Sequence, residues 1–204
     1  MTGAREMARA VADGAVVGVR FHGRGGQGVL ALAEGLALAV RHEGHPAQAW
    51  TFGAQRTGAP VVCCCRINDA EPGRAPLADP QVIVVRDVSV MGAADVLVGL
   101  RPDGWLLLDT PHRPADLGLG PAVAALPAHH AVAVGATELA RAHLGRPMPN
   151  AALLGALAAL TGVVGLDAVH HAIDAKGHRR AGRGALAAAD AAYHEVLDRL
   201  EPAR

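Results

Sequence analysis

The 204-residue chain has very little of several residue types on which common enzyme classes depend. Lys176 is its only lysine and follows no glycine-rich loop, which excludes a P-loop, because that motif needs a lysine directly after its glycines. Ser89 is its only serine and lies outside any GxSxG sequence, which excludes a hydrolase with a nucleophile elbow. The chain also has no HExxH sequence, so a zincin is excluded as well.

Cysteine is confined to three consecutive positions, Cys63–Cys65, within an apolar run. On a strand these side chains alternate between the two faces, so they cannot bind one metal ion together. The chain has neither a CxxC sequence nor a ferredoxin-type cysteine run, which excludes an iron–sulfur protein. We expect the three cysteines to be small buried hydrophobic residues.

Net charge and long apolar runs are also lacking. Nineteen basic and nineteen acidic residues cancel, so no overall field attracts nucleic acid or an anionic membrane. The apolar runs are interrupted before they reach the roughly 20 residues that span a bilayer. Met1–Gly14 lacks the apolar core of a secretory signal. We therefore expect a cytoplasmic protein without nucleic-acid or membrane partners, in which these first 14 residues are flexible.

Short apolar runs alternate with helical patterns along the rest of the chain, which predicts a single α/β domain over residues 1–204. Runs this short and continuous are typical of strands that are covered on both faces. The predicted strands are Val16–Phe21, Ala47–Phe52, Pro60–Ile67, Gln81–Val85, Trp105–Leu108 and Ala131–Val134. The fold is expected to be Rossmann-like, with a mostly parallel sheet, helices on both faces and a helical C-terminal third over residues 136–204.

In that C-terminal third, helices are predicted at Thr137–Leu144, Asn150–Leu160, Asp167–Lys176 and Ala185–Leu200. Asn150 is the expected N-cap of the second of these helices. The basic cluster Arg179–Arg183 is expected to be a solvated connection before the last helix, or a contact with an acidic partner. The pairs His129–His130 and His170–His171 are not expected to bind a metal, because adjacent side chains diverge on both strands and helices.

A glycine loop, Gly23-Arg24-Gly25-Gly26-Gln27-Gly28, lies between the first predicted strand and the helix that begins at Val29. This GxGxxG spacing places backbone N–H groups at a helix N-terminus, where they can bind an anion. A dinucleotide site also needs a carboxylate at the end of the second strand, and that strand ends in Thr51-Phe52-Gly53. Three interpretations remain: a nucleotide site, close packing of helix on sheet, and a contact with an anion or a partner. Arg24 and Gln27 favour the third.

A second loop of turn residues, Gly53–Ala59, surrounds Arg56. Both loops should lie at the carboxyl edge of the sheet, so we expect them to converge. Arg24 and Arg56 would then form a local positive site on a protein without net charge.

The order of these motifs resembles the gamma subunit, or gamma domain, of pyruvate and related 2-oxoacid:ferredoxin oxidoreductases. The glycine loop is similar to the GxGGQG opening of that family, and Thr51–Val61 followed by Arg66-Ile67 is similar to its FGxERRGAPV segment and the next strand. The similarity covers roughly residues 16 to 175 and continues through Leu77–Pro80, Gly135–Ala140, Pro149-Asn150 and Leu154–Leu157.

The resemblance implies a chain that serves a complex rather than acting alone. The complex would convert a 2-oxoacid to acyl-CoA with thiamine diphosphate, Mg²⁺, iron–sulfur clusters and CoA, held in or with other subunits. The implied partners are thiamine-binding alpha- and beta-type subunits and a ferredoxin-like subunit, and a homodimer of the isolated chain stays open. No residue is expected to be catalytic or to bind a metal, and the isolated chain should be inactive. The candidate contacts to CoA or to a partner are Gly23, Arg24, Gly25, Gly26, Gln27, Gly28, Arg56 and Gly58.

Two departures from the family pattern leave alternatives open. Gln55 and Thr57 stand where the family has an acid and an arginine, and Ala185-Leu186-Ala187 stand where an asparagine is expected. The alternatives are the small subunit of an indolepyruvate-type oxidoreductase and a stand-alone Rossmann-like nucleotide-binding domain. The sequence names no particular 2-oxoacid.

Overall fold

The computed structural model describes residues 2–53, 56–69, 75–92, 95–176 and 179–200. Six strands form one sheet in the order β2-β3-β1-β4-β5-β6. Their bounds are β1 (Val17–Arg24), β2 (Ala47–Phe52), β3 (Pro60–Ile67), β4 (Val82–Val85), β5 (Trp105–Asp109) and β6 (Ala131–Val134). β3 pairs antiparallel with both β1 and β2, whereas β1, β4, β5 and β6 pair parallel. All strands except β3 therefore run in one direction, which confirms the mostly parallel sheet.

Among the described residues, one helix precedes β1, two lie between strands, and four follow β6. They are α1 (Thr2–Ala12), α2 (Val29–His42), α3 (Gly120–Ala124), α4 (Ala136–Leu144), α5 (Asn150–Thr161), α6 (Leu166–Lys176) and α7 (Arg179–Leu200), with 3₁₀ turns η1 (Val88–Gly92) and η2 (Pro114–Leu117). The helical C-terminal third is thus confirmed. Within the described residues, no helix combines the length and apolar character needed to cross a membrane.

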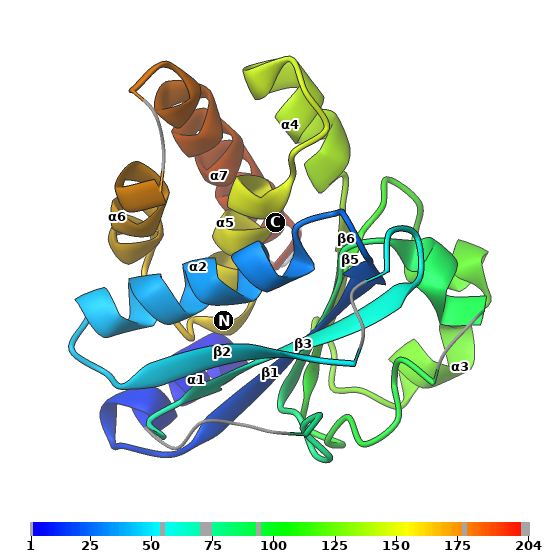
Figure 1. The fold of residues 1–204 in the computed structure, drawn as a ribbon. Coiled ribbons are helices and arrows are strands. Elements are labelled where there is room, and N and C mark those ends of the chain that lie inside the picture. Colours follow the sequence, from blue (N-terminus) through cyan, green and yellow to red (C-terminus); the bar gives the residue numbers. More distant parts are fainter. Residues whose placement is uncertain (1, 54–55, 70–74, 93–94, 177–178, 201–204) are drawn as a thin grey trace.

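Alternating strand residues bury both faces of the sheet, but the two faces differ in what covers them. The larger core lies between one face and the long helices, and α5 is buried along nearly its whole length at the centre of this layer. The second core is smaller and is covered by η1, η2 and α3. Figure 1 shows α2, α5, α6 and α7 together on one side of the sheet and α3 on the other. Helices cover both faces as expected, with all the long ones on the same face.

Under β1, the second face contains two buried polar residues. The Arg20 guanidinium donates hydrogen bonds to the carbonyl oxygens of Leu77, Val96 and Val98, which ties two loops to the sheet. Its Nε also donates to Nε2 of His22 at 3.0 Å, so His22 must be neutral at that nitrogen. Burial, and secondarily the charge of Arg20, lower the pKa of His22 to about 4.

Two segments differ from the sequence-based expectation. The flexible stretch expected at residues 1–14 instead contains α1, because Val11 is buried in the main core and Met7 packs against it. Asn68 secures the end of this segment by donating from Nδ2 to the carbonyl oxygens of Val11 and Ala15. The expected connection at Arg179–Arg183 is also wrong, because α7 already begins at Arg179.

Candidate functional site

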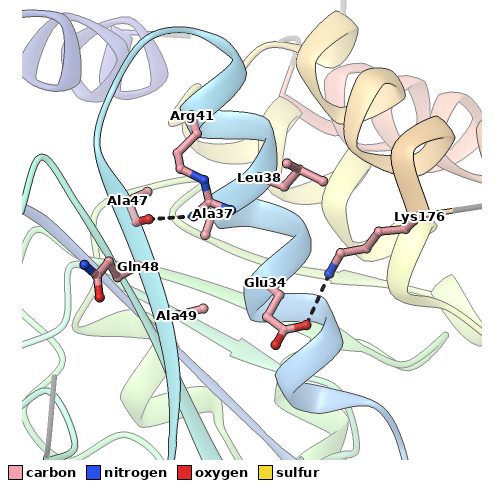
Figure 2. Close-up of a pocket in the computed structure, with 8 residues that line it drawn as sticks. All are labelled: Glu34, Ala37, Leu38, Arg41, Ala47, Gln48, Ala49 and Lys176. Carbon is pink, nitrogen blue, oxygen red and sulfur yellow. Dashed lines mark hydrogen bonds and ion pairs between the residues drawn. The ribbon is translucent and has the colours of Figure 1, made fainter. Parts of the chain in front are cut away.

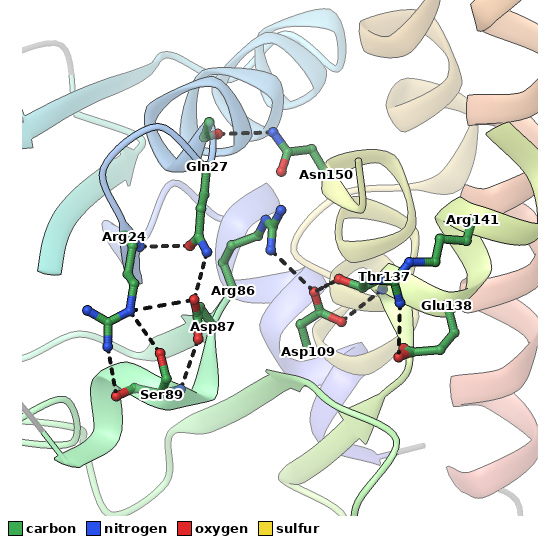
Figure 3. Close-up of polar contacts among 11 residues, drawn as sticks. Arg24, Gln27, Arg86, Asp87, Ser89, Asp109, Thr137, Glu138, Arg141 and Asn150 are labelled. Atoms are coloured by element: carbon green, nitrogen blue, oxygen red, sulfur yellow. Dashed lines mark hydrogen bonds and ion pairs between the residues drawn. The ribbon is translucent and has the colours of Figure 1, made fainter. Parts of the chain in front are cut away.

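The carboxyl edge of the parallel strands gathers polar residues from four separate segments. Arg24 ends β1, Arg86 and Asp87 follow β4, Asp109 ends β5, and Thr137 lies in the first turn of the helix after β6. In open α/β sheets, ligands bind outside this edge. Figure 3 shows these side chains in two neighbouring groups, Arg24 and Asp87 below the glycine loop, and Arg86, Asp109 and Thr137 beside the start of α4.

The glycine loop and the second loop meet at this edge, as the sequence predicted. Strand β1 continues through Gly23 and Arg24, so the free loop is shorter than the motif. The Gly25 N–H donates to the carbonyl oxygen of Ala59 at 2.8 Å, and the Gly58 N–H donates to the carbonyl oxygen of Gly25 at 2.9 Å. A Cβ atom on Gly25 would lie 2.0 Å from the carbonyl oxygen of Arg56, so only glycine permits this approach.

Arg24 is largely occupied in holding the surrounding loops. Its Nε donates to Oγ of Ser89 at 2.8 Å, and its two terminal nitrogens donate to the carbonyl oxygens of Gly58 at 2.9 Å and Ser89 at 3.2 Å. Three of its five N–H groups are thereby used, and two remain, one on each terminal nitrogen. The side chain is 30% exposed, and those two groups have no partner among the described residues.

The Gln27 side chain links the start of the glycine loop to Asp87, which lies shortly after β4. Its Oε1 accepts the backbone N–H of Arg24 at 2.8 Å, and its Nε2 donates to Oδ2 of Asp87 at 2.6 Å. Asp87 also accepts the Ser89 N–H and lies 3.7 Å from Nε of Arg24. Burial alone would raise the pKa of Asp87, but the hydrogen bonds from Ser89 and Gln27 and the charge of Arg24 outweigh burial and lower it.

Arg56 differs from Arg24 because its side chain is exposed and makes no hydrogen bond or ion pair with any residue that the structure describes. Its carbonyl oxygen contacts the glycine loop and accepts the Ala59 N–H. The neighbouring Gln55, which was expected to be part of this loop, lies outside the described residues. Arg56 is therefore an exposed cation without a polar partner among the described residues, and its backbone adjoins the glycine loop.

The sequence reasoning missed a buried polar group next to this loop. Oδ2 of Asp109 lies 3.7 Å from a terminal nitrogen of Arg86, and the Asp109 carboxylate accepts the backbone N–H and the hydroxyl of Thr137 at 2.9 and 2.6 Å. Burial raises the pKa of Asp109 despite these contacts, and burial likewise lowers the pKa of Arg86. A usable signal was present, because each of these residues lies at or soon after the end of a predicted strand.

Asn150 joins two helix N-termini at the same place. Its Nδ2 donates to the carbonyl oxygen of Gly28, the N-cap of α2, at 3.0 Å. The prediction that Asn150 is itself an N-cap is wrong, since Pro149 holds that position in α5. Neither helix has a side-chain cap, so N–H groups of both first turns are left without that partner. Oδ1 of Asn150 and Nε of Arg86 are buried without a hydrogen-bond partner among the described residues.

A hollow of about 560 Å³ lies elsewhere, between α2 and the edge strand β2 (Figure 2). Its charged groups are already paired: Lys176 with Glu34 at 3.3 Å, and Arg41 with the carbonyl oxygen of Ala47 at 2.7 Å. It contains none of the site residues predicted from the sequence. The carboxyl edge therefore remains the better candidate.

The other sequence-based candidates have structural roles. Cys63, Cys64 and Cys65 are fully buried with raised pKa values, and burial raises that of Cys65 to about 12. The two adjacent histidines of α6 diverge as expected, because His170 contacts Asp190 whereas His171 stacks on His42. Within the described part of the chain, no three potential ligands come together to hold a metal ion.

Fold and site together define a Rossmann-like α/β protein whose distinctive surface is a glycine loop at the carboxyl edge of the sheet. The model of the family "Pyruvate ferredoxin/flavodoxin oxidoreductase" matches residues 18–195. The chain belongs to this family, as the gamma subunit of a pyruvate or related 2-oxoacid:ferredoxin oxidoreductase.

Individual relatives agree with this assignment. Pyruvate synthase subunit PorC of Methanocaldococcus jannaschii is 34% identical over 184 residues, which are 89% of this chain and 98% of that protein. The common gamma subunit of the pyruvate/ketoisovalerate oxidoreductases of Thermococcus kodakarensis is 36% identical, with the same two coverages.

Solved structures share the fold. The crystal structure of pyruvate oxidoreductase subunit PORC from Thermotoga maritima superposes with a TM-score of 0.73 at 28% identity, covering 88% of this chain and 96% of that one. A 2-oxoglutarate:ferredoxin oxidoreductase from Magnetococcus marinus, solved with 2-oxoglutarate, coenzyme A and succinyl-CoA bound, superposes with a TM-score of 0.67 at 18% identity. It aligns with 92% of this chain over 32% of its own length.

Proposed function

We propose that this chain completes a cytoplasmic complex with thiamine-binding subunits and a ferredoxin-like subunit, and that its carboxyl edge binds an anionic group of CoA. Thiamine diphosphate, Mg²⁺ and the iron–sulfur clusters belong to the other subunits. The described residues of this chain do not fit a cluster, because its three cysteines alternate across a buried strand. Its contribution is to bind and orient, and none of its residues is assigned a catalytic role.

The observation that carries this proposal is the convergence of the two loops. The hydrogen bonds of Gly25 and Gly58 join the loops, so Arg24 and Arg56 lie on one surface of a protein without net charge. Two free N–H groups of Arg24 can form a bidentate contact with a phosphate, and Arg56 adds a second positive charge. The uncapped first turn of α2 adds backbone N–H groups to the same surface.

The nature of the reaction supports a phosphate ligand at this surface. The related Magnetococcus marinus enzyme was solved with coenzyme A and succinyl-CoA bound. Both carry the phosphates of CoA, which arginine forks and helix N-termini recognise. For this chain we propose the same class of ligand, with the glycine loop, Arg56 and Gly58 as the contacting residues.

A second candidate function, docking of a partner subunit at the same edge, is favoured by two exposed apolar side chains. Phe52 is 49% exposed at the end of β2, and Met148 is 55% exposed just before α5. Large exposed apolar side chains beside a cation are typical of protein interfaces. A partner carboxylate would then take the place of the CoA phosphate at Arg56.

The test is Arg56→Ala in the assembled complex, with Arg101→Ala as a matched control. Arg101 is also an exposed arginine, but it precedes β5 and so lies at the opposite edge of the sheet. For an exposed cation that contacts CoA phosphate, we expect the KM for CoA to rise about fivefold with kcat little changed. The control should leave both constants unchanged.

The competing outcomes are distinct. Loss of subunits from the complex, with normal CoA kinetics in the complex that remains, would assign Arg56 to partner docking. Unchanged assembly together with an unchanged KM would contradict both functions and leave the loop with a structural role only. Size-exclusion chromatography with steady-state kinetics separates these outcomes.

A further inference from the structure

Among the described residues, Asp87 is the one acidic residue whose side chain forms an ion pair with Arg24 or Arg56. Its Oδ2 lies 3.7 Å from Nε of Arg24, which is beyond hydrogen-bonding distance but close enough for strong electrostatic attraction. The carboxylate is held in place by Gln27 and by the backbone N–H of Ser89 rather than by Arg24. It therefore stays beside the guanidinium whether or not Arg24 has another partner.

The position of this carboxylate has a direct electrostatic consequence. With the side chains of Arg24 and Asp87 only 30% and 22% exposed, water screens their interaction incompletely. Asp87 thus cancels part of the positive charge that Arg24 and Arg56 offer, and it repels any anion that approaches the two free N–H groups of Arg24. A site built only for the tightest binding would not place a fixed carboxylate there.

We propose that Asp87 sets the affinity of the carboxyl edge for the CoA phosphate group, keeping it weak enough for the product to leave. This inference rests on the proposed function. Substrate CoA and product acyl-CoA carry the same phosphates, so tight phosphate binding would retain both equally and slow the release of product. Asp87 acts through Arg24, so it is a positioning and affinity-setting residue and not a catalytic one.

The experiment is Asp87→Asn in the assembled complex, with the KM for CoA measured at low and high ionic strength. Removing one charge beside a partly buried arginine should lower this KM about threefold to fivefold. The effect should shrink in 0.5 M salt, since it is electrostatic. The substitution also disturbs the contact with Gln27 or Ser89, and that structural loss alone would raise the KM or leave it unchanged at any salt concentration.

Two further variants keep the test decisive. In the double variant Arg24→Gln/Asp87→Asn, the substitution of Asp87 should no longer lower the KM for CoA. The positive charge of Arg24, which Asp87 offsets, is absent from this variant. Ser89→Asp places a second carboxylate on the side chain that contacts Nε of Arg24, and it should raise the KM for CoA about fivefold. Ser89 is exposed, so this variant is expected to fold even if Asp87→Asn fails to assemble.

The results separate this inference from the proposed function on which it rests. An unchanged or higher KM in Asp87→Asn, or an unchanged KM in Ser89→Asp, overturns the role of Asp87. If Arg56→Ala nevertheless raises the KM, the CoA function stands and only the affinity-setting role fails. If none of these substitutions affects the KM, both fail.

Discussion

Arg24 and Arg56 show how two similar arginines acquire different roles within one small surface. Both were predicted to project from loops toward an anion. Arg24 instead uses three of its donors on Ser89 and Gly58, and Asp87 offsets its charge, whereas the Arg56 side chain makes no hydrogen bond or ion pair with the described residues. The structure therefore places Arg24 in the framework that holds the two loops, and leaves Arg56 as the more exposed cation.

His22 makes the stability of this protein depend on pH. Its pKa is about 4 in the folded protein, because of burial and then the charge of Arg20, against about 6.5 in an unfolded chain. Between these two pH values the unfolded state binds more protons than the folded state. The contribution of His22 to the unfolding free energy is therefore fully present above pH 6.5 and is lost as the pH decreases toward 4. We expect this residue to remove about 2 kcal/mol of unfolding free energy between pH 7 and pH 5.

Urea unfolding of the wild type and of His22→Gln at both pH values checks this prediction. Glutamine can still accept a hydrogen bond from Arg20 but does not titrate, so the variant should lose less stability on acidification. Equal losses in the two proteins would show that His22 does not contribute to the pH dependence.

Among the elements, the two edge strands are protected in the same way. Arg41, in the last turn of α2, donates to the carbonyl oxygen of Ala47 in β2, and Arg199, in the last turn of α7, donates to that of Ala133 in β6. An arginine thus occupies a hydrogen-bonding position at each end of the sheet. Such charges discourage another strand from adding to an exposed edge.

Helices α5 and α7 form a close pair in which a glycine is essential. A Cβ atom on Gly155 would lie 2.1 Å from the carbonyl oxygen of Ala189. Because this oxygen belongs to the backbone, no change of side-chain conformation can relieve the clash. Small residues such as Ala188, Ala189 and Ala192 line α7 on its buried side. The alanine-rich composition of both helices therefore serves close packing against the sheet.

Gly155→Ala should force these two helices apart. We expect a loss of about 1–3 kcal/mol in unfolding free energy, which is typical of overpacked cores. Gly182→Ala is the matched control in α7, because its Cβ would meet only Asp174 Oδ1 at 3.7 Å. The control should gain about 0.5–1 kcal/mol from better helix propensity. Thermal melting of the two variants decides the matter, and a Gly155→Ala protein as stable as the control would contradict the packing argument.

At the scale of the whole molecule, the chain is one part of a larger enzyme. It aligns with nearly the whole length of its gamma-subunit relatives, and its three cysteines are buried in β3. The described residues offer no ligand set for a metal, and the candidate site combines arginines, hydroxyls, carboxylates and backbone donors that are mostly bonded to one another.

The isolated chain is accordingly predicted to be inert toward pyruvate, 2-oxoglutarate and branched 2-oxoacids with CoA and a viologen acceptor. In the proposed complex, the groups that accept the electrons released on decarboxylation belong to the other subunits. Co-expression with the thiamine-binding and ferredoxin-like subunits should restore turnover. Oxidation of a 2-oxoacid by the rigorously purified single chain would refute the subunit assignment, and the same assay on the co-expressed complex serves as the positive control.

Local patterns in the sequence specify the six strands and the chemistry of the loops. Continuous apolar runs marked all six strands to within a few residues, and the glycine and arginine motifs identified both loops that form the site. These features are local: a strand covered on both faces needs apolar residues at every position, and a close backbone approach needs glycine, wherever the chain goes next.

Long-range packing determines which of these strands, helices and loops come into contact. The antiparallel direction of β3, the docking of α1, the bond from Asn150 to Gly28 and the contacts of Asp109 with Arg86 and Thr137 all join segments far apart in the chain. No local pattern specifies such partners, because a polar residue at a strand end can face solvent, a ligand or another loop with equal local cost. The partner of each polar group is fixed when the strands and helices pack together. A buried donor or acceptor must then pair with one of the groups that the fold places beside it.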